Sequence, residues 1–159
     1  MIHNMDASAL QLAQGVLASQ PFSALLGTRV VSFGGGRASL ELVVRPTLRQ
    51  QYGFVHGGVL AYLVDNALTF AGGSVLGSTG IVTAEIKVNY LRPATGDGRL
   101  IADAVVVGSS KRQAVCRCDV YIETDGERKL VAVGQGTICR SERATEAPAV
   151  GVTFEAIRI

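Results

Sequence analysis

The order of hydrophobic and polar positions along the chain predicts one long buried helix among several strands. Residues 59–71 form the most hydrophobic stretch, and they are rich in Ala and Leu. A segment of this length that is apolar nearly all round is typical of a helix covered on most sides. Gly72, Gly73 and Gly77 follow, and we expect these glycines to loosen or end the helix.

Shorter segments in which apolar and polar residues alternate predict strands on both sides of this helix. In the segment after it, Val82, Ile86 and Tyr90 alternate with Thr83 and Lys87 at a period of two. Glycine-rich turns, such as the three consecutive glycines before residue 37, indicate hairpins between neighbouring strands. The predicted strands cover residues 28–33, 37–44, 82–90, 100–107, 111–124 and 130–140.

These elements predict a single α+β domain. An antiparallel sheet of five to six strands wrapped around the long central helix would cover that helix all round. The domain spans residues 21–140, after an N-terminal segment, residues 1–20, that contains a short helix. Residues 141–159 begin polar and turn apolar near the end, and we interpret them as a C-terminal tail. The second face of the sheet and its free edges favour a homo-oligomer.

Composition narrows the class of protein further. The chain has 159 residues and a formal net charge of +2, which is too small for a dedicated nucleic-acid-binding protein. Its two histidines are His3 and His56, so chemistry that needs a cluster of histidines is excluded. The apolar stretch over residues 59–76 is interrupted by polar side chains, so no membrane-spanning segment is predicted.

Cysteine usage indicates a reducing compartment. Cys116, Cys118 and Cys139 make an odd count, and the first two lie two positions apart in a predicted strand, which is poor disulfide geometry. Together with His56 they lack the pattern of a zinc site, so no metal is expected. We expect small buried hydrophobic side chains in a cytoplasmic protein.

Asp65 is the residue that most needs an explanation. It lies within the predicted helix, where Val64 and Leu68 are its neighbours, and burying an unpaired carboxylate is unfavourable. No Lys or Arg occurs between Arg49 and Lys87, so no cation lies one helical turn away. The alternative is a residue that simply faces solvent. A desolvated carboxylate without a local cation is, however, the environment of a general base.

The tripeptide His56-Gly57-Gly58 stands where this helix begins. Backbone N–H groups in a first helical turn have no partner within the helix, and the helix dipole attracts negative charge there. Because glycine has no Cβ, a ligand oxygen could approach the Gly57 and Gly58 amides closely, as in an oxyanion hole. The motif alone is also consistent with an ordinary helix start. The carboxylate seven residues beyond Gly58 favours the functional interpretation.

The distance between these two features predicts a shared site. Asp65 lies eight positions after Gly57, or roughly 12 Å along one helix. One chain therefore cannot place both groups on the same substrate carbonyl. Two helices that run antiparallel across a two-fold axis would bring each Asp65 beside the partner's Gly57. We expect a homodimer with two composite sites, which could associate further as a dimer of dimers, and an inactive monomer.

Several stretches of the chain resemble the phenylacetate-degradation (PaaI-type) hotdog thioesterases. They are Gly53-Phe54-Val55-His56-Gly57-Gly58, Leu63-Val64-Asp65-Asn66-Ala67, and Thr83 through Asn89-Tyr90-Leu91-Arg92-Pro93-Ala94. The resemblance covers roughly residues 20–140 and implies the hotdog fold, in agreement with the helix and sheet predicted above. It also implies hydrolysis of an acyl-coenzyme A (acyl-CoA) thioester, aryl or medium-chain, to a carboxylic acid and free CoA. No metal is implied, and no cofactor beyond the CoA of the substrate.

The resemblance further implies roles for individual residues. Asp65 would be the general base or nucleophile, acting on substrate held by the opposite subunit. The Gly57 amide would be the oxyanion donor, with His56 beside the thioester. Gln50, where many relatives carry Asn, and Thr83 would help to place the water or the carbonyl.

A second set of residues is predicted to bind the substrate. Three cations of this set could contact the phosphates of CoA, although solvated charges at strand ends are an equally good interpretation. Two aromatic residues are candidates for the acyl pocket, although such residues are often plain core. The predicted substrate-binding residues are Gly58, Asn66, Phe54, Tyr62, Arg92, Lys111 and Arg112.

Two other functions remain open. A hotdog dehydratase acting on 3-hydroxyacyl thioesters would use His56 paired with Asp65 as its acid and base. The H-G-G context suits carbonyl binding better than this role. A non-catalytic acyl-CoA-binding protein would bind the same ligand without turnover, and it would need an effector domain for which the short flanking segments leave no room.

Overall fold

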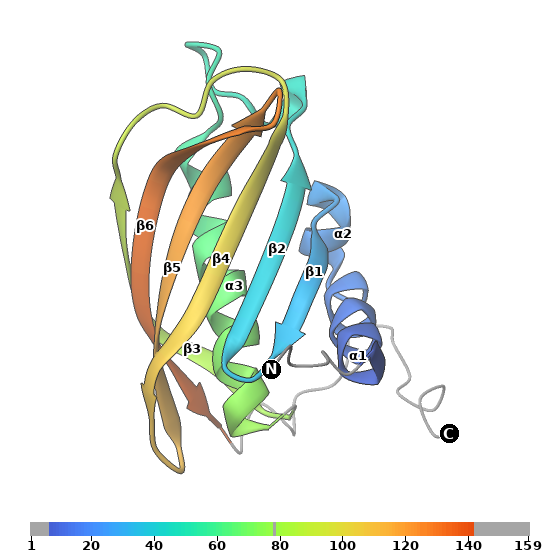
Figure 1. Cartoon of the computed structure of the whole chain (residues 1–159), viewed down its shortest axis with the longest axis vertical. Coiled ribbons are helices and arrows are strands. Elements are labelled where there is room, and N and C mark those ends of the chain that lie inside the picture. Colours follow the sequence, from blue (N-terminus) through green and yellow to red (C-terminus); the bar gives the residue numbers. More distant parts are fainter. Residues whose placement is uncertain (1–6, 78, 142–159) are drawn as a thin grey trace.

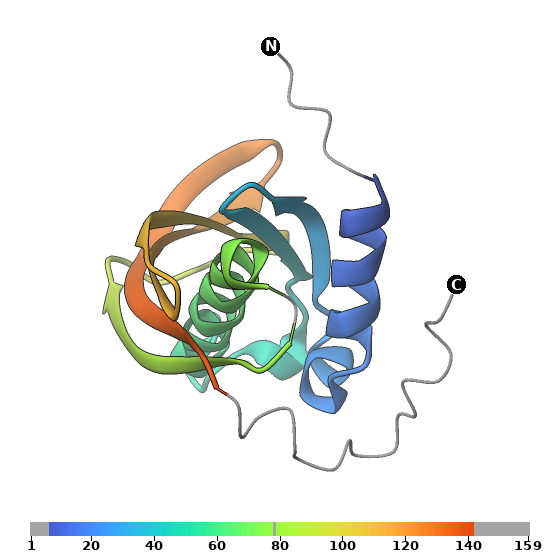
Figure 2. The ribbon, with the colours of Figure 1, turned by 90° about the horizontal axis from the view of Figure 1, so that it is seen from below.

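The computed structural model describes residues 7–77 and 79–141, and it shows one antiparallel sheet curled around one long helix (Figure 1). The elements are α1 (Ala7–Ala18), α2 (Pro21–Leu26), β1 (Arg29–Gly34), β2 (Arg37–Val43), a 3-10 turn η1 (Pro46–Leu48), α3 (Gly57–Leu76), β3 (Ile81–Tyr90), β4 (Arg99–Ser109), β5 (Gln113–Thr124) and β6 (Glu127–Arg140). The strands follow the order β1-β2-β4-β5-β6-β3, and each pair of neighbours is antiparallel. Figure 2 shows the sheet wrapping around α3, with α1 and α2 outside it beside β1. The predicted α+β architecture is confirmed.

Helix α3 extends beyond residue 71, although the glycines that follow were expected to loosen or end it. It continues through Gly72 and Gly73 to Leu76, and Gly77, with a φ of 106°, ends it. Gly72 is needed for packing, because a Cβ there would lie 2.8 Å from the Cβ of Ile138 on β6. This glycine therefore allows close contact with the sheet instead of ending the helix.

A second short helix follows the N-terminal segment, and one strand boundary differs from the prediction. Helix α1 ends at Ala18 within the predicted segment, and α2 begins at Pro21. A proline is well suited to a first helical turn because the N–H that it lacks has no partner there. The strand expected from residue 111 begins at Gln113, and Lys111 and Arg112 belong to the turn before it.

Two glycines of β6 allow α3 to pack closely against the sheet. A Cβ on Gly134 would clash with Val64, and a Cβ on Gly136 would lie 3.1 Å from Cδ1 of Leu68. Val64 and Leu68 are both fully buried, so the middle of the helix lies directly on this strand. The position of Asp65, next to Val64, is therefore fixed by packing as well as by helix geometry.

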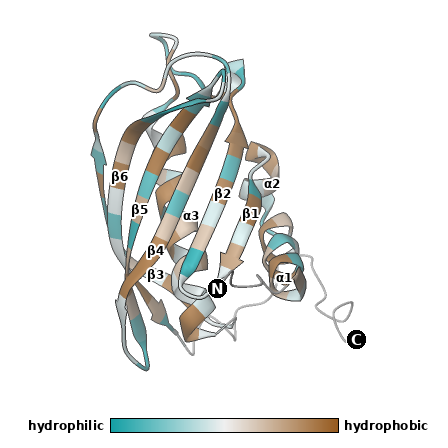
Figure 3. Cartoon of the chain, viewed as in Figure 1, coloured by the Kyte–Doolittle hydropathy of each residue, from teal (hydrophilic) through white to brown (hydrophobic). Residues whose placement is uncertain are grey.

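The strands alternate between a buried inner face and a more polar outer face (Figure 3). Inner-facing side chains and the apolar side chains of α3 form one core. Its fully buried members include Leu40, Leu63, Leu68, Leu100, Val120 and Ile138. Helix α3 is long and apolar enough to cross a membrane by length and composition alone, yet its apolar side chains are the centre of this core.

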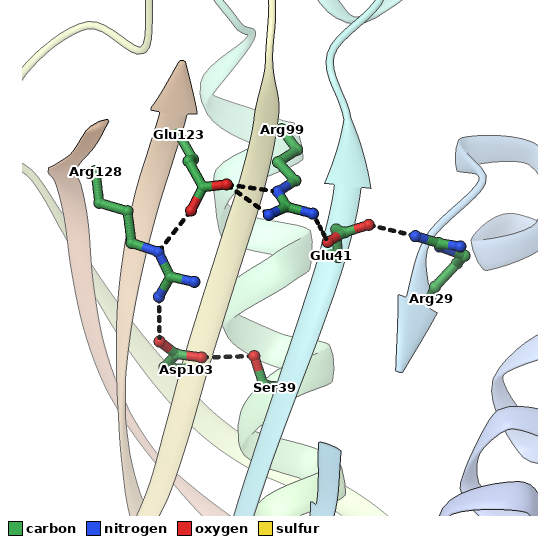
Figure 4. A network of polar contacts seen from close by, with 7 residues as sticks. All are labelled: Arg29, Ser39, Glu41, Arg99, Asp103, Glu123 and Arg128. Atoms are coloured by element: carbon green, nitrogen blue, oxygen red, sulfur yellow. Dashed lines mark hydrogen bonds and ion pairs between the residues drawn. The ribbon is translucent and has the colours of Figure 1, made fainter. Parts of the chain in front are cut away.

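Charged side chains on the outer face are paired with one another. Glu41, itself buried, binds Arg29 at 2.5 Å and Arg99 at 2.8 Å. The pairs continue through Glu123 and Arg128 to Asp103, which accepts a hydrogen bond from Ser39 at 2.5 Å, so the network joins β1, β2, β4, β5 and β6 (Figure 4). Hydrogen bonds from Arg128 and Arg99 hold the pKa of Glu123 below its ordinary value. These arginines are therefore committed to carboxylates of the same chain. The network comprises Arg29, Ser39, Glu41, Arg99, Asp103, Glu123 and Arg128.

The N-terminal segment contains a helix, and the cysteines are free thiols. Helix α1 lies within the predicted segment 1–20 and packs on β1, whereas all but the first residue of the predicted tail 141–159 lie outside the described residues, as does His3. Cys116 and Cys118 are buried and Cys139 is partly buried, and all three are free thiols. Burial raises the pKa of Cys116 to about 11, which makes it a poor nucleophile.

Candidate active site

The first turn of α3 is organised by His56. Its Nδ1 accepts a hydrogen bond of 2.9 Å from the N–H of Gly58, which makes His56 the N-cap of the helix. A Cβ on Gly58 would lie 3.0 Å from that same nitrogen, so the cap itself favours glycine at this position. Gly57 is different, because a Cβ there would make only ordinary contacts of 3.5 Å with the Tyr90 ring. The packing of the chain therefore does not by itself require glycine at position 57.

A pocket of about 490 Å³ opens beside this first turn. Gly57 and Gly58 line it together with Phe54, Tyr90 and Arg92. The Tyr90 hydroxyl donates a hydrogen bond of 3.1 Å to the Gly57 carbonyl, and so connects the end of β3 to the start of α3. Four predicted site residues, two glycines, one aromatic residue and one arginine, meet at this pocket.

Asp65 lies in a second cluster in the middle of α3. Its Oδ1 accepts a hydrogen bond of 2.6 Å from the hydroxyl of Thr83 on β3. The Thr83 hydroxyl is also 2.9 Å from that of Thr69, which contacts the Asp65 carbonyl at 2.8 Å. Within residues 7–77 and 79–141, Thr83 is the one side chain that binds this carboxylate, so the second carboxylate oxygen is left for water or substrate.

A β-bulge places Thr83 in this cluster. Simple alternation would put Thr83 and Ile86 on opposite faces of β3, yet both face α3. The pairing of β3 with β6 shifts between Thr83 and Glu85, and the extra residue reverses the alternation at this point. Thr69 was not among the predicted site residues, although a Thr one helical turn after Asp65 was a usable signal.

The two clusters remain apart within one chain. Gly57 and Asp65 are eight positions apart on a continuous helix, which corresponds to roughly 12 Å. No hydrogen bond joins His56 to Asp65 among the described residues. One chain thus presents an amide donor with a pocket at one level of the helix and a carboxylate at another.

Gln50 is used within its own loop. Its Oε1 accepts a hydrogen bond of 2.9 Å from the N–H of Tyr52, and its backbone N–H donates to the carbonyl of Phe54. Arg49 reinforces the same loop by donating to the carbonyl of Gly53 at 2.6 Å. These contacts shape the segment that leads into the helix, and the role of Gln50 toward water or a carbonyl stays a prediction.

Tyr62 and Asn66 face the N-terminal helices and not the pocket at the start of α3. The Tyr62 hydroxyl lies 2.8 Å from Ser23 Oγ and 3.0 Å from Thr28 Oγ1. The amide of Asn66 donates to Ser23 and to Gln20. Within one chain both residues therefore hold α2 against α3, and their contacts with substrate stay a prediction.

Lys111 and Arg112 are also distant from that pocket. They lie in the β4–β5 turn, at the opposite end of the molecule from the loop before α3 (Figure 1). The N–H of Arg140 donates to the Arg112 carbonyl at 2.9 Å, and the Arg140 side chain binds the carbonyl of Leu76, the last residue of α3. Within one chain, Arg140 thus links this turn to the C-terminal end of α3.

Both clusters lie within a segment of the chain that matches a known protein family. Residues 52–129 match the family model described as the thioesterase superfamily. This segment contains the first turn of α3 as well as Asp65 and Thr83. Both parts of the candidate site therefore lie inside the match.

Individual relatives extend over most of the chain. A candidate esterase of Halobacterium salinarum is 34% identical over 141 residues, which span 83% of this chain and 91% of the relative. Human acyl-coenzyme A thioesterase 13 is 27% identical over 135 residues, 84% of this chain and 95% of that protein. A mutant structure of the phenylacetic acid degradation protein PaaI from Thermus thermophilus is 33% identical, with a TM-score of 0.67, and the match covers 77% of this chain and 100% of that one.

Proposed function

This chain belongs to the thioesterase superfamily and is a thioester hydrolase with the hotdog fold, and we propose that it acts on acyl-CoA thioesters. The resemblance to PaaI-type proteins is confirmed by the match to the Thermus PaaI structure. The name of the human relative supports CoA as the thiol of the substrate. The observation that carries the proposal is the placement of the Asp65 carboxylate. Asp65 lies on α3, the helix whose first turn contains Gly57, and its carboxylate accepts a hydrogen bond from Thr83 of β3.

The proposed reaction uses one backbone amide, one carboxylate and water. The N–H of Gly57 would bind the carbonyl oxygen of the thioester, where negative charge develops during attack. Asp65 would take a proton from water while the water oxygen bonds to the carbonyl carbon. The C–S bond of the tetrahedral intermediate then breaks to give the carboxylic acid, and the proton held by Asp65 passes to the CoA thiolate, which restores the carboxylate. Within the described ranges, no three His, Cys, Asp or Glu side chains group as a metal site.

We propose that each site is built from two chains. A separation of roughly 12 Å along one helix prevents Gly57 and Asp65 of one chain from acting on the same carbonyl. Antiparallel packing of two α3 helices about a two-fold axis would bring the partner's Asp65 to Gly57. Strand β3, which contains Thr83, is an edge strand: no other strand of residues 7–77 and 79–141 pairs with its outer side, which supports an interface there.

The geometry favours hydrolysis over dehydration. In a dehydratase His56 would exchange protons with the substrate, but its Nδ1 is engaged by the N–H of Gly58. Asp65, in contrast, has one carboxylate oxygen that no described residue binds. The thioesterase should therefore depend more strongly on Asp65 than on His56, and the dehydratase would show the reverse.

The test is thiol release from a panel of acyl- and aryl-CoAs. Asp65→Asn and Asp65→Ala are expected to lower kcat by about 10²- to 10⁴-fold, and His56→Ala by about tenfold or less. Melting curves would show that the variants are folded. Absence of thioester hydrolysis by the wild type, or wild-type rates in both Asp65 variants, would contradict the proposal.

Isotope labelling decides how Asp65 acts. In a single turnover in ¹⁸O-water, a general base directs the heavy oxygen into the product acid. Direct attack by the carboxylate would form a mixed anhydride, and its hydrolysis at the Asp65 carbonyl carbon would put the label into Asp65 and leave an enzyme oxygen in the product acid. Label found in the Asp65 peptide by mass spectrometry therefore identifies the covalent route.

We place this reaction in the cytoplasm. Cys116, Cys118 and Cys139 are free thiols, and the first two are fully buried as small hydrophobic side chains. Free buried thiols are typical of proteins kept in a reducing environment.

A further inference from the structure

A small apolar pocket lies one helical turn beyond Asp65. Its walls include Val16, Phe33, Phe70 and Ile81, and its volume is about 160 Å³. Thr69 also lines it, and the Thr69 hydroxyl contacts both the Asp65 carbonyl and the Thr83 hydroxyl. The pocket is therefore directly connected to the carboxylate cluster. We infer that it receives the acyl group and limits its size, with Gly73 as the specificity-determining residue; this inference rests on the proposed acyl-CoA hydrolysis.

Gly73 is a glycine that the packing of the chain does not require. A Cβ on the preceding Gly72 would meet Ile138 at 2.8 Å, whereas a Cβ on Gly73 would meet only Ile81, at 3.8 Å. Glycine inside a helix is unfavourable compared with alanine. Gly73 lines the pocket, so the space that its missing side chain leaves belongs to the pocket. A bound acyl group accounts for that space.

The volume sets the size of the group. A dry cavity of about 150 Å³ is sufficient for a benzene molecule. A pocket of about 160 Å³ thus holds about six carbon atoms, as a ring or as a short chain. Phe33 and Phe70 pack edge to face, with ring centroids 6.0 Å apart, and give the pocket a stiff wall. A longer acyl chain would extend beyond these walls.

The position of the pocket along α3 agrees with a site shared by two chains. It lies toward the C-terminal end of α3, where Gly73 and Gly77 line it, whereas the larger pocket lies at the N-terminal end of the same helix. In an antiparallel pair of helices, the larger pocket of one chain and the small pocket of its partner would lie on either side of the reacting carbonyl. The CoA part and the acyl part would then occupy different chains.

The test measures kcat/KM for acetyl-, butyryl-, hexanoyl-, octanoyl- and lauroyl-CoA. The wild type should prefer acyl groups up to hexanoyl and lose about tenfold or more by lauroyl. Gly73→Val, which fills the pocket, should reduce the hexanoyl-to-acetyl ratio by about tenfold. Phe33→Ala should extend the range to octanoyl.

Gly15→Val is the matched control, because it makes the same change in α1 where no atom lies within 4 Å of the added Cβ. Its chain-length profile should equal that of the wild type. A wild-type preference for lauroyl-CoA, or an unchanged hexanoyl-to-acetyl ratio in Gly73→Val, would overturn the pocket assignment while leaving the proposed hydrolysis intact. No hydrolysis of any thioester would overturn both. Melting curves show that each variant is folded.

Discussion

The start and the middle of helix α3 carry the two parts of the candidate site, and they are built in opposite ways. At the start, the proposed functional group is the backbone N–H of Gly57, and a contact that orders this turn joins His56 to Gly58, two positions apart. In the middle, the proposed functional group is a side chain, Asp65, and it is held by Thr83, which is 18 positions away on another element.

This difference shows which part depends more strongly on the rest of the fold. The first turn is capped by His56, a neighbour in sequence, and the Tyr90 hydroxyl of β3 adds one contact to the Gly57 carbonyl. The carboxylate needs the glycines of β6 that seat the helix, and a β-bulge that turns Thr83 inward. In the proposed mechanism neither part acts alone, because roughly 12 Å of helix separates them in one chain.

The largest effect is expected when the two parts are inactivated in different chains. Gly57→Val and Asp65→Asn should each abolish most activity. Dimers assembled at random from the two variants should recover about a quarter of the wild-type rate, because half of them contain one intact site of two. Thiol release after co-refolding measures this recovery. If the mixed dimers are no more active than the separate variants, Gly57 and Asp65 act within one chain and the shared site is wrong. An active monomer in sedimentation experiments would lead to the same conclusion.

Gly134→Ala tests how the middle of the helix is seated. The added methyl group would clash with Val64, so the free energy of unfolding should fall by about 1–3 kcal/mol. Denaturant unfolding measures this change. Gly108→Ala is the control, because it is also a strand glycine and no atom lies within 4 Å of its added Cβ. Equal stabilities of the two variants would show that close packing on β6 does not hold α3 in place.

Thr83→Val tests the positioning of Asp65. The substitution keeps the shape of the side chain but removes the donor of the 2.6 Å hydrogen bond. We expect kcat to fall about tenfold with KM nearly unchanged, since a hydrogen bond to a charged group contributes about 1.5–3 kcal/mol. Thr83→Ser should restore the rate. A rise in KM at constant kcat would instead indicate that Thr83 contacts the substrate.

The elements and the main site residues could be predicted to different degrees. The buried helix and six strands follow from hydrophobic periodicity, which is a local property of the chain. Asp65 was identifiable because no cation lies near it in sequence. Alternation alone would have turned Thr83 away from Asp65, since a bulge arises from pairing with β6 and leaves no local signal.

The predicted substrate contacts show the same division. Tyr62 and Asn66 follow the helix pattern, but only the packing of α2 decides that they bind Ser23. Lys111 and Arg112 have the charge that CoA phosphates require, yet the fold places them at the far end of α3. Charge and spacing indicate what a residue can do, whereas its partners depend on contacts between distant segments.

The sequence by itself determined the helix, its glycine-rich start and a carboxylate within it that has no cation nearby in sequence. These features depend on residues a few positions apart, where helix geometry fixes the distances. Only the tertiary structure decided that Gly72 is a packing requirement and that Gly73 opens a pocket, although the two glycines are adjacent. The physical reason is that neighbouring positions on a helix face different elements, and the space that each one meets is set by strands far away in the chain.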